Sequence, residues 1–318
     1  MDKNTKIYVA GHRGLAGSAI VRELLKQGYG NIVTRSHMEL DLEDAAETIK
    51  FFEKERPELV FLAAAKVGGI FANNAFPVEF LMSNLLVEAS VFRAAHATEV
   101  NRLIFLGSSC IYPRNCPQPI KEEYLLSGAL EPTNRAYALA KIAGIEMCWS
   151  YNREYGTKWL AAMPTNLYGP GDNYDLNNSH VLPALIRKMH EAKVSGAQEV
   201  VLWGTGNAKR EFLYVDDLAD GLVFLATLDD ERYEMLVDQA HCPLINLGSG
   251  EDLSIRELAE VVAEVIGYKG NFIQDSSKPD GTMRKVLDVS KLRGLGWAPH
   301  FDLHSGLQIT YENFRMNT

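Results

Sequence analysis

The stretch that decides the fold is Ile7-Tyr8-Val9-Ala10-Gly11-His12-Arg13-Gly14-Leu15-Ala16-Gly17. Its first four residues read as a buried strand, and an amphipathic, helix-like segment runs from residue 15 to residue 26. The three glycines allow a tight turn and a close approach of the backbone to a pyrophosphate, and the helix N-terminus adds free N–H groups. We therefore predict a dinucleotide site. The spacing is G-x-x-G-x-x-G rather than G-x-G-x-x-G, and a plain tight turn is the alternative.

Beyond this turn, short apolar runs alternate with longer amphipathic segments. We expect strands at 6–10, 32–34, 59–62, 103–106 and 159–163. We expect helices at 15–26, 45–55, 80–96 and 136–155. Strands that are apolar throughout and joined by helices predict a parallel sheet covered on both faces. Right-handed crossovers then give an α/β fold with a doubly wound sheet of the Rossmann type.

After Pro164 this rhythm breaks. The remaining expected elements are a loop at 170–179, a helix from 180 or 181, a strand at 200–203, a helix at 216–228, a strand at 245–247 and a helix at 255–266. We predict that residues 1–168 plus 214–248 form the dinucleotide-binding domain. Residues 169–213 plus 249–318 then form a smaller, interleaved C-terminal α/β domain that binds the substrate.

Composition excludes several classes of function. The chain has 318 residues, 47% hydrophobic and 23% charged, and a net charge of −9. This balance is that of a globular protein, and the negative charge argues against nucleic acid or anionic membranes as partners. We expect no membrane helix, signal peptide or metal site. The four cysteines lack Cys-x-x-Cys spacing, which indicates a reducing, cytoplasmic location.

The end of the second strand bears on which dinucleotide binds. An acidic residue there would bind the ribose of NAD and repel a 2′-phosphate. The chain instead has Thr34-Arg35-Ser36-His37, and Arg13 lies in the glycine turn. We predict NADP(H), with Arg35 and His37 near the phosphate. A solvated surface arginine is the alternative for Arg35. Asp41 and Leu42 are expected near the adenine.

A tyrosine and a lysine mark the expected chemistry. Tyr137 and Lys141 are four residues apart, on one face of the long helix. A nearby cation lowers the pKa of a phenol, although such pairs are common on amphipathic helices. Ser108 follows the fourth strand, at the sheet edge where ligands bind, and can share a carbonyl oxygen with Tyr137. Together these features resemble the extended short-chain dehydrogenases/reductases that modify nucleotide sugars.

Five runs carry a closer resemblance. They are AAAKVGGI at 63–70, GSSCIYP at 107–113, PTNLYGP at 164–170, NSHV at 178–181 and KPDGT at 278–282. They resemble the GDP-L-fucose synthase family, and the similarity spans nearly the whole chain. The resemblance implies a dimeric, bifunctional enzyme. It would epimerise GDP-4-keto-6-deoxy-mannose at C3 and C5 and then reduce C4 with NADPH, giving GDP-L-fucose.

The resemblance also implies roles for individual residues. Ser108 and Tyr137 would hydrogen-bond the enolate oxygen, Cys110 would be the base, and His180 the acid. Strand alternation would place Cys110 on the same side as Ser108. Tyr137 would also protonate the C4 oxygen, and Lys141 would hold the nicotinamide ribose. On their own, Cys110 reads as a small buried hydrophobe and His180 as a solvent-facing residue.

Two further sets of contacts are expected. Cations for the substrate's diphosphate are Arg187, Lys188, Arg210 and Lys285, with surface ion pairs as the alternative for Lys188 and Lys285. Whether Arg187 or Lys188 faces the phosphates stays open. The resemblance adds Trp203 and Asp280 as sugar-nucleotide contacts. It also implies cofactor contacts from Leu106, Gly107, Ser108, Ser109, Lys141, Pro164, Thr165, Asn166, Leu167 and His180.

Other functions remain as alternatives. One is a nucleotide-sugar 4,6-dehydratase or 4-epimerase, but dehydratases of this superfamily usually carry an acidic pair where Ser109-Cys110 stands. Another is a non-catalytic NADP-sensing protein, whose signature would be the loss of Tyr137 or Lys141. The helices at 80–96 and 136–155 either pair across the two-fold axis of a homodimer or simply cover the sheet.

Overall fold

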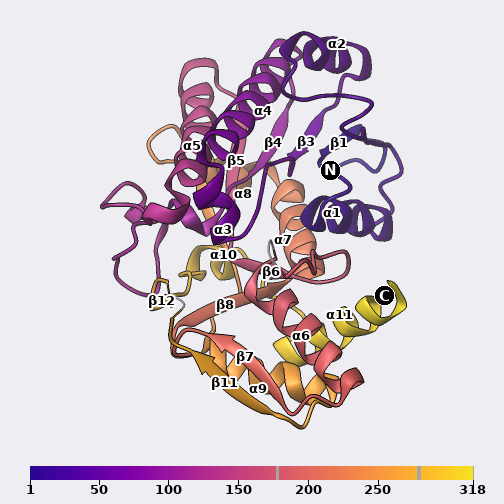
Figure 1. The fold of residues 1–318 in the computed structure, drawn as a ribbon. Helices are drawn as coiled ribbons and strands as arrows, with labels where there is room; N and C mark the ends of the chain where they lie inside the picture. The colour runs from indigo at the N-terminus through magenta and orange to yellow at the C-terminus, as the bar shows by residue number, and fades with distance from the viewer. Residues whose placement is uncertain (177–178, 278–280, 318) are drawn as a thin grey trace.

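The computed structural model describes residues 1–176, 179–277 and 281–317. The chain forms two lobes, and the upper one in Figure 1 contains a parallel sheet. Its strands run in the order β2-β1-β3-β4-β5-β9. They are β1 (Ile7–Ala10), β2 (Ile32–Val33), β3 (Leu59–Leu62), β4 (Arg102–Leu106), β5 (Lys158–Pro164) and β9 (Leu244–Leu247). The strand order reverses between β1 and β3, and ligands of such sheets bind at this switch point.

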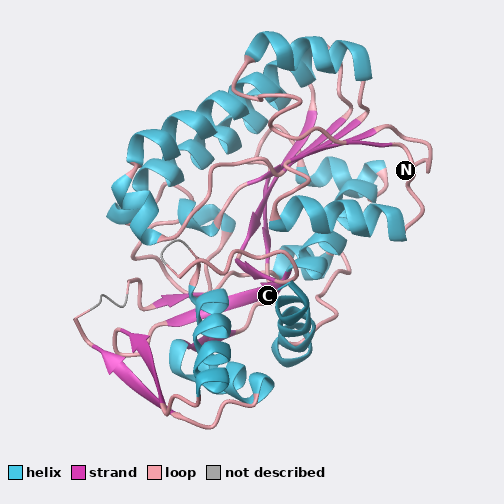
Figure 2. Cartoon of the chain, turned by 45° about the vertical axis from the view of Figure 1, so that its right-hand side comes forward, coloured by secondary structure: helices cyan, strands magenta, loops and turns pink. Residues whose placement is uncertain are grey.

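Helices cover both faces of this sheet, as Figure 2 shows. One face packs against α1 (Leu15–Lys26), α7 (Val215–Thr227) and α8 (Asp230–Leu236). The other face packs against α2 (Ala45–Glu55), α4 (Pro77–Ala97) and α5 (Arg135–Tyr155). The strand residues between them are almost all fully buried, because each strand contributes side chains to both cores. The prediction of a doubly wound parallel α/β sheet is confirmed.

The lower lobe is built around β8 (Lys209–Tyr214). Its partners are β6 (Asn166–Tyr168), β10 (Asp252–Ser254) and β12 (Arg284–Lys285). A separate parallel ribbon pairs β7 (Glu199–Trp203) with β11 (Asn271–Asp275). These strands share a core with α6 (Val181–Ser195), α9 (Ile255–Ile266) and α11 (Leu303–Asn317). Because β6 pairs with β8, the chain enters the second sheet at Asn166, within the segment assigned from sequence to the first domain.

Five short elements complete the described chain. They are α3 (Ile70–Ala75), the 3₁₀ turns η1 (Ser109–Ile111), η2 (Glu122–Tyr124) and η3 (Pro132–Asn134), and α10 (Ser290–Gly294). The buried Glu211 carboxylate links β8 to the loop after β9 and to the segment after β12 by accepting hydrogen bonds from the backbone N–H groups of Gly250 (2.7 Å) and Leu287 (2.8 Å). No helix in the described part of the chain is long and apolar enough to cross a membrane.

Candidate active site

The glycine turn lies at the switch point of the sheet. Gly11 has φ +83°, and a Cβ on it would lie 2.7 Å from the backbone nitrogen of Ala64, just after β3. A Cβ on Gly17 would lie 2.1 Å from the Gly11 carbonyl oxygen. Gly14, the N-cap residue of α1, has no side chain that could accept from the helix N–H groups, and the first turn of α1 carries no acidic residue. The first N–H groups of α1 are therefore available to an anion, which fits a dinucleotide pyrophosphate.

The loop after β2 holds the residues predicted for the 2′-phosphate. Arg35 is half-buried and donates to Glu55 (2.8 Å) and to the carbonyl of Thr34 (2.7 Å). The loop also contains a carboxylate that the sequence analysis did not weigh. Glu39 accepts hydrogen bonds from the backbone N–H (2.7 Å) and the hydroxyl (2.6 Å) of Ser36. These bonds, with smaller contributions from two arginines, lower the pKa of Glu39.

The remaining predicted residues of this region differ in exposure. Arg13 is exposed beside the glycine turn, while the side chain of Leu42 is buried in the core. His37 and Asp41 are exposed and lie 3.7 Å apart. One ring nitrogen of His12 is buried without a hydrogen-bond partner. The turn thus keeps an unpaired polar atom next to the helix end that fits a phosphate.

Cys110 lies beside Ser108, but for a different reason than predicted. The chain leaves β4 at Leu106, and residues 109–111 form a 3₁₀ turn that Ser108 caps by accepting from the Cys110 N–H (3.3 Å). The argument from strand alternation is therefore wrong, because these residues are not in a strand. Cys110 Sγ accepts a hydrogen bond from the side-chain amide of Asn134 (3.2 Å), and Lys285 Nζ lies 3.9 Å away. Neither contact with sulfur was predicted.

Tyr137 is buried at the start of α5, where its ring packs edge-on against Phe80 at a centroid distance of 6.3 Å. Burial raises its pKa well above the ordinary value, and the negative charges of Cys110 and Glu88 add to the rise. A hydrogen bond with Ser108 opposes it. The expectation that a neighbouring cation would lower this pKa is not met. Tyr137 is therefore a phenol at neutral pH, which can donate but not accept a proton.

Lys141 forms an ion pair inside the protein. Its Nζ lies 3.3 Å from Oε1 of Glu88 on α4, and both side chains are about 1–2% exposed. Burial raises the pKa of Glu88 to about 7, against the attraction of the ammonium. Burial also lowers the pKa of Lys141, and Glu88 opposes this shift. Glu88 was not among the predicted site residues, although it continues the four-residue spacing of Phe80 and Asn84 on the buried face of α4.

His180 precedes α6 and is its N-cap residue, without a side-chain cap. Its side chain reaches solvent, yet the surrounding protein lowers its pKa by desolvation, which favours the neutral imidazole. Asn178 of the same motif lies outside the described residues. In the motif after β5, Thr165 and Asn166 both donate to the backbone carbonyl of Glu211 (3.2 and 2.8 Å). These two side chains thereby hold β8 at the edge of the first sheet.

The other predicted cofactor residues lie along the same edge of the sheet. Leu106 ends β4, and Gly107 donates its N–H to the carbonyl of Ala162 on β5 (2.9 Å). Ser109 is buried within η1. Pro164 ends β5, and Leu167 is partly buried in β6. Together with the glycine turn, these residues lie at the carboxyl ends of β1, β4 and β5.

The predicted substrate residues form two groups. Lys188 Nζ lies over the ring of Trp203 (5.2 Å to the centroid) and donates to the carbonyl of Val201 (3.3 Å). Arg187 instead pairs with Glu191 (2.8 Å). On the paired strands β8 and β12, Arg210 and Lys285 stand in register. Asp280 lies outside the described residues.

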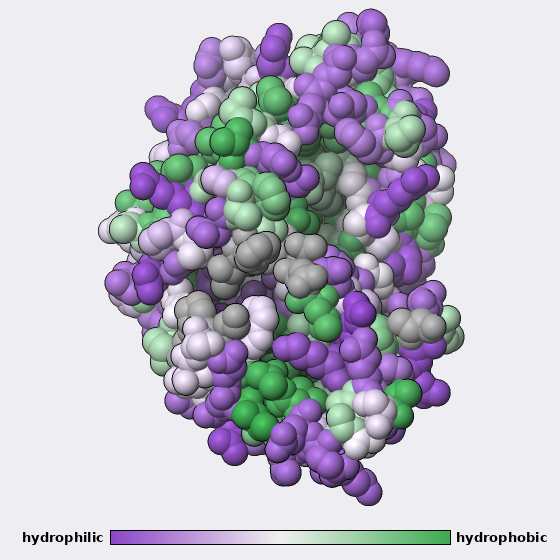
Figure 3. Space-filling view, viewed as in Figure 1, coloured by the Kyte–Doolittle hydropathy of each residue, from purple (hydrophilic) through white to green (hydrophobic). Residues whose placement is uncertain are grey.

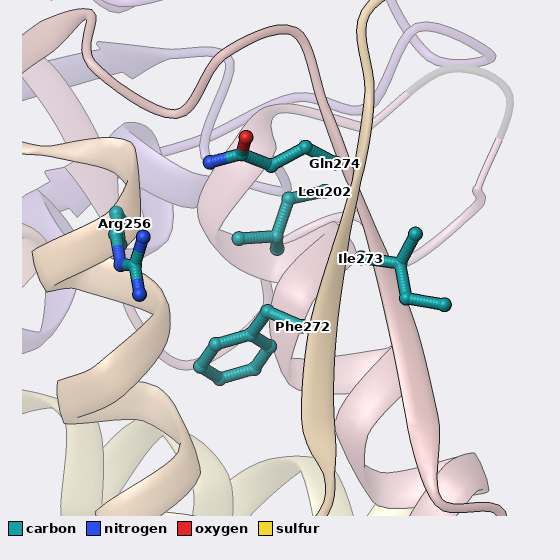
Figure 4. A pocket seen from close by; sticks show the side chains of 5 residues that line it. All are labelled: Leu202, Arg256, Phe272, Ile273 and Gln274. Carbon is teal, nitrogen blue, oxygen red and sulfur yellow. The ribbon is translucent and has the colours of Figure 1, made fainter.

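A separate cavity of about 380 Å³ lies in the lower lobe, away from these groups. It is lined by Leu202, Arg256, Phe272, Ile273 and Gln274 (Figure 4). In this view Ile273 points away from Arg256, so the cavity lies on the inner face of the β7–β11 ribbon. The outer face carries the exposed Val201 and Ile273, and Figure 3 shows a hydrophobic patch over this ribbon. None of the lining residues was predicted as a site residue.

Three comparisons with known proteins bear on this geometry. The model of the NAD dependent epimerase/dehydratase family matches residues 7–236. GDP-L-fucose synthase 1 of Arabidopsis thaliana is 54% identical over 316 residues, covering 99% of this chain and 95% of that protein. GDP-L-fucose synthase of Escherichia coli is 50% identical over 312 residues (98% and 97%). The structure of MlghC, a GDP-mannoheptose C4 reductase from Campylobacter jejuni with NADP bound, has a TM-score of 0.90 at 38% identity and covers 99% of each chain.

Proposed function

Because the chain belongs to the NAD dependent epimerase/dehydratase family, we propose that it makes GDP-L-fucose from GDP-4-keto-6-deoxy-mannose with NADPH. The curated relatives that are 50–54% identical over nearly the whole chain include several GDP-L-fucose synthases. The observation that carries the proposal is the contact of Ser108 with both Cys110 and Tyr137. Ser108 accepts from the backbone N–H of Cys110, and the thiol of Cys110 acts electrostatically on Tyr137, so thiol, hydroxyl and phenol lie near one another at the end of β4. A single ketone placed there can be enolised and reduced.

Epimerisation uses the acidity of the carbons beside the ketone. We propose that Cys110 removes a proton from C3 or C5 as the base and that His180, in its imidazolium form, returns one on the opposite face and becomes neutral, the form that its surroundings favour. Ser108 and Tyr137 donate hydrogen bonds to the oxygen where the enolate charge develops. The amide of Asn134 and the ammonium of Lys285 contact Cys110 Sγ and can orient it toward the substrate. Neither carries out the proton transfer itself.

Reduction follows at the same carbonyl. NADPH supplies the hydride to C4 when it is bound. The buried phenol of Tyr137 gives its proton to the C4 oxygen, and its raised pKa keeps that proton available at neutral pH. We propose that Lys141 holds the nicotinamide ribose. The Gly11–Gly17 turn binds the pyrophosphate at the start of α1, with Arg13 and Arg35 near the 2′-phosphate.

The lower lobe is proposed to hold the GDP moiety. Lys188 and Trp203 lie together, with a cation over an aromatic ring, and this favours Lys188 over Arg187 as the diphosphate contact. Arg210 and Lys285 add positive charge from paired strands. Lys285 therefore lies between the diphosphate side and Cys110. We propose residues 1–168 plus 214–248 as the cofactor domain and residues 169–213 plus 249–318 as the substrate domain, with β6 as the strand of the first that pairs into the sheet of the second.

We also propose a cytoplasmic homodimer. Val78, Met82 and Leu86 recur every four residues on α4 and are exposed, and Leu139 is exposed on the adjoining α5. Such an apolar stripe on two packed helices suits a second copy of the same surface. The four cysteines are free, as expected in a reducing compartment. Light scattering of the wild type against Leu86→Glu would report the loss of the dimer.

The test is an incubation with GDP-4-keto-6-deoxy-mannose and NADPH in D₂O, with the product identified by NMR. We expect GDP-L-fucose with deuterium at C3 and C5 and one NADPH consumed per turnover. A 4-epimerase or a dehydratase would regenerate its cofactor, and a simple C4 reductase would leave C3 and C5 unlabelled. An NADP-sensing protein would bind NADPH without oxidising it.

Tyr137→Phe should bind NADPH and lose reduction, and retention of more than about a tenth of the turnover would contradict its role as the proton donor.

A further inference from the structure

The ion pair between Glu88 and Lys141 includes a carboxylate that the mechanism above does not use. Both side chains are fully buried, on α4 and α5, and the second carboxylate oxygen has no hydrogen-bond partner. Taking two charges out of water carries a desolvation penalty that their attraction often fails to offset. A buried pair of this kind is therefore weak as a device for stability. Its position next to Tyr137 indicates a role in the chemistry.

The helix–helix contact is shaped around this carboxylate. A Cβ on Gly144 would lie 3.0 Å from Glu88 Oε2 and 2.3 Å from the Phe105 ring. Glycine at this position of α5 therefore leaves room for both groups. The ring of Phe105 lies in turn 4.6 Å from the Lys141 ammonium, and that ammonium lies 6.0 Å from the centre of the Tyr137 ring. Lys141 is thus held between a carboxylate and an aromatic face, the two partners that a buried cation prefers.

Burial and the neighbouring charges both act on the pKa values of Lys141 and Glu88. Burial lowers the pKa of Lys141, and Glu88 is the group that opposes this shift. The titratable groups coupled to Glu88 are Lys141, Tyr137 and Cys148, all on α5. Lys141 is the charge that acts on Glu88 in return. Without the carboxylate, the ammonium would stand in a dry site with only aromatic rings beside it.

We propose that Glu88 is a positioning residue that acts through Lys141, fixing its side chain beside Tyr137 and keeping it in the charged form. The inference rests on the proposed function, in which Lys141 holds the nicotinamide ribose. It has a second consequence for Tyr137. Because the pair is neutral overall, the phenol does not face an uncompensated cation. It keeps its proton, which is the state that a reduction at C4 requires.

The test is Glu88→Gln, which removes the charge and nearly preserves the shape. The Lys141–Tyr137 pair then titrates without its counter-ion, and one of the two groups loses its proton at a lower pH. Either loss stops reduction at alkaline pH. We expect the alkaline limb of kcat to move down by at least about one pH unit, a tenfold change in the ratio of the two protonation states. The Kd for NADPH, measured by its fluorescence without sugar substrate, should rise over the same pH range.

Two further variants separate positioning from folding. Glu122→Gln is the matched control, because Glu122 is a buried carboxylate with its own ion pair to Lys291 (3.5 Å). It should lower the melting temperature and leave the alkaline limb in place. Glu88→Asp keeps the charge one methylene further away, so the alkaline limb of its kcat should lie between those of the wild type and Glu88→Gln. If the glutamine variant does not fold, the aspartate variant alone tests whether Glu88 positions Lys141.

The outcomes distinguish this inference from the proposed function. Suppose that every Glu88 variant that folds keeps both the alkaline limb of kcat and the NADPH affinity of the wild type. The pair would then have only a structural role, and the inference would be overturned while the proposed function stands. Wild-type protein that fails to turn over the 4-keto sugar nucleotide would overturn the proposed function, and this inference with it. A shift that also occurs in Glu122→Gln would reflect general destabilisation and would likewise overturn it.

Discussion

Gly17→Ala should loosen the first helix from the sheet. The new Cβ would lie 2.1 Å from the Gly11 carbonyl oxygen and 2.6 Å from its carbon, both of them backbone atoms. The helix must therefore retreat by about 1 Å to restore ordinary contact. That helix buries Ala19, Ile20 and Leu24 completely. Full burial of such side chains contributes roughly 1.5–3 kcal/mol each for the two larger ones, and a gap of this size forfeits about a quarter to a half of the contact.

The expected loss of unfolding free energy is therefore about 1–3 kcal/mol, which corresponds to a fall in Tm of about 1.5–4.5 °C for a chain of this size. Thermal unfolding by circular dichroism measures it, and NADPH titration should show at least about a tenfold weaker Kd because the helix N-terminus has moved. Gly14→Ala is the matched control, since its Cβ would meet the same oxygen at 3.4 Å with φ −79°. If Gly17→Ala melts with the wild type, the close approach is not what this glycine provides.

Three further predictions follow from single contacts. Cys110→Ala should abolish deuterium uptake from D₂O at C3 and C5 while NADPH binding survives; unchanged exchange would remove Cys110 from the mechanism. Arg35→Ala should lower kcat/KM for NADPH about tenfold and leave that for NADH within about twofold, because only the former carries the 2′-phosphate; an equal loss for both cofactors would assign Arg35 to its ion pair with Glu55. Asp172→Asn should flatten the pH dependence of stability. Burial raises the folded-state pKa of Asp172 to about 7 from 3.8, so the folded chain binds the proton more tightly, and wild-type stability falls as pH rises between these values. A wild-type curve with no steeper fall than that of the variant would contradict this.

The first lobe could be predicted because the burial of its strands on both faces also determines their sequence pattern. Its strands are buried on both faces, so runs such as 59–62 are apolar throughout and stand out from the amphipathic helices. Helices 15–26, 45–55 and 255–266 begin and end where the apolar periodicity does. The small sheet of the lower lobe escaped notice because its strands are short and polar. β8 starts with Lys209-Arg210-Glu211, and β12 has two charged residues. Their pairing depends on distant partners rather than on a local pattern.

In the candidate active site too, some residues could be predicted from the sequence and others could not. Motif spacing and strand position selected Ser108 and Tyr137, and the family resemblance added Cys110. In the structure, Ser108 contacts Tyr137 and the backbone N–H of Cys110. It was not sufficient to find Asn134 or Glu88. Asn134 acts from a 3₁₀ turn, and its contact with Cys110 depends on how two loops fold against each other. Glu88 looks like one of many glutamates on a helix until the buried face of α4 is known. A carboxylate at the four-residue spacing of a helix's buried face is nonetheless a usable signal, since charges are rarely buried without a partner.

Both of the proposed reactions require that Tyr137 carry its proton. Enolisation needs a neutral hydrogen-bond donor at the carbonyl oxygen, and reduction needs a proton ready to leave for that oxygen. An uncompensated lysine would favour the phenolate, which can do neither. Burial of Tyr137, the negative charges of Cys110 and Glu88, and the pairing of Lys141 all favour the protonated form instead. In the proposed mechanism, the same electrostatic arrangement therefore serves both steps, because the protonated phenol donates a hydrogen bond to the enolate oxygen in the first step and gives its proton to the C4 oxygen in the second.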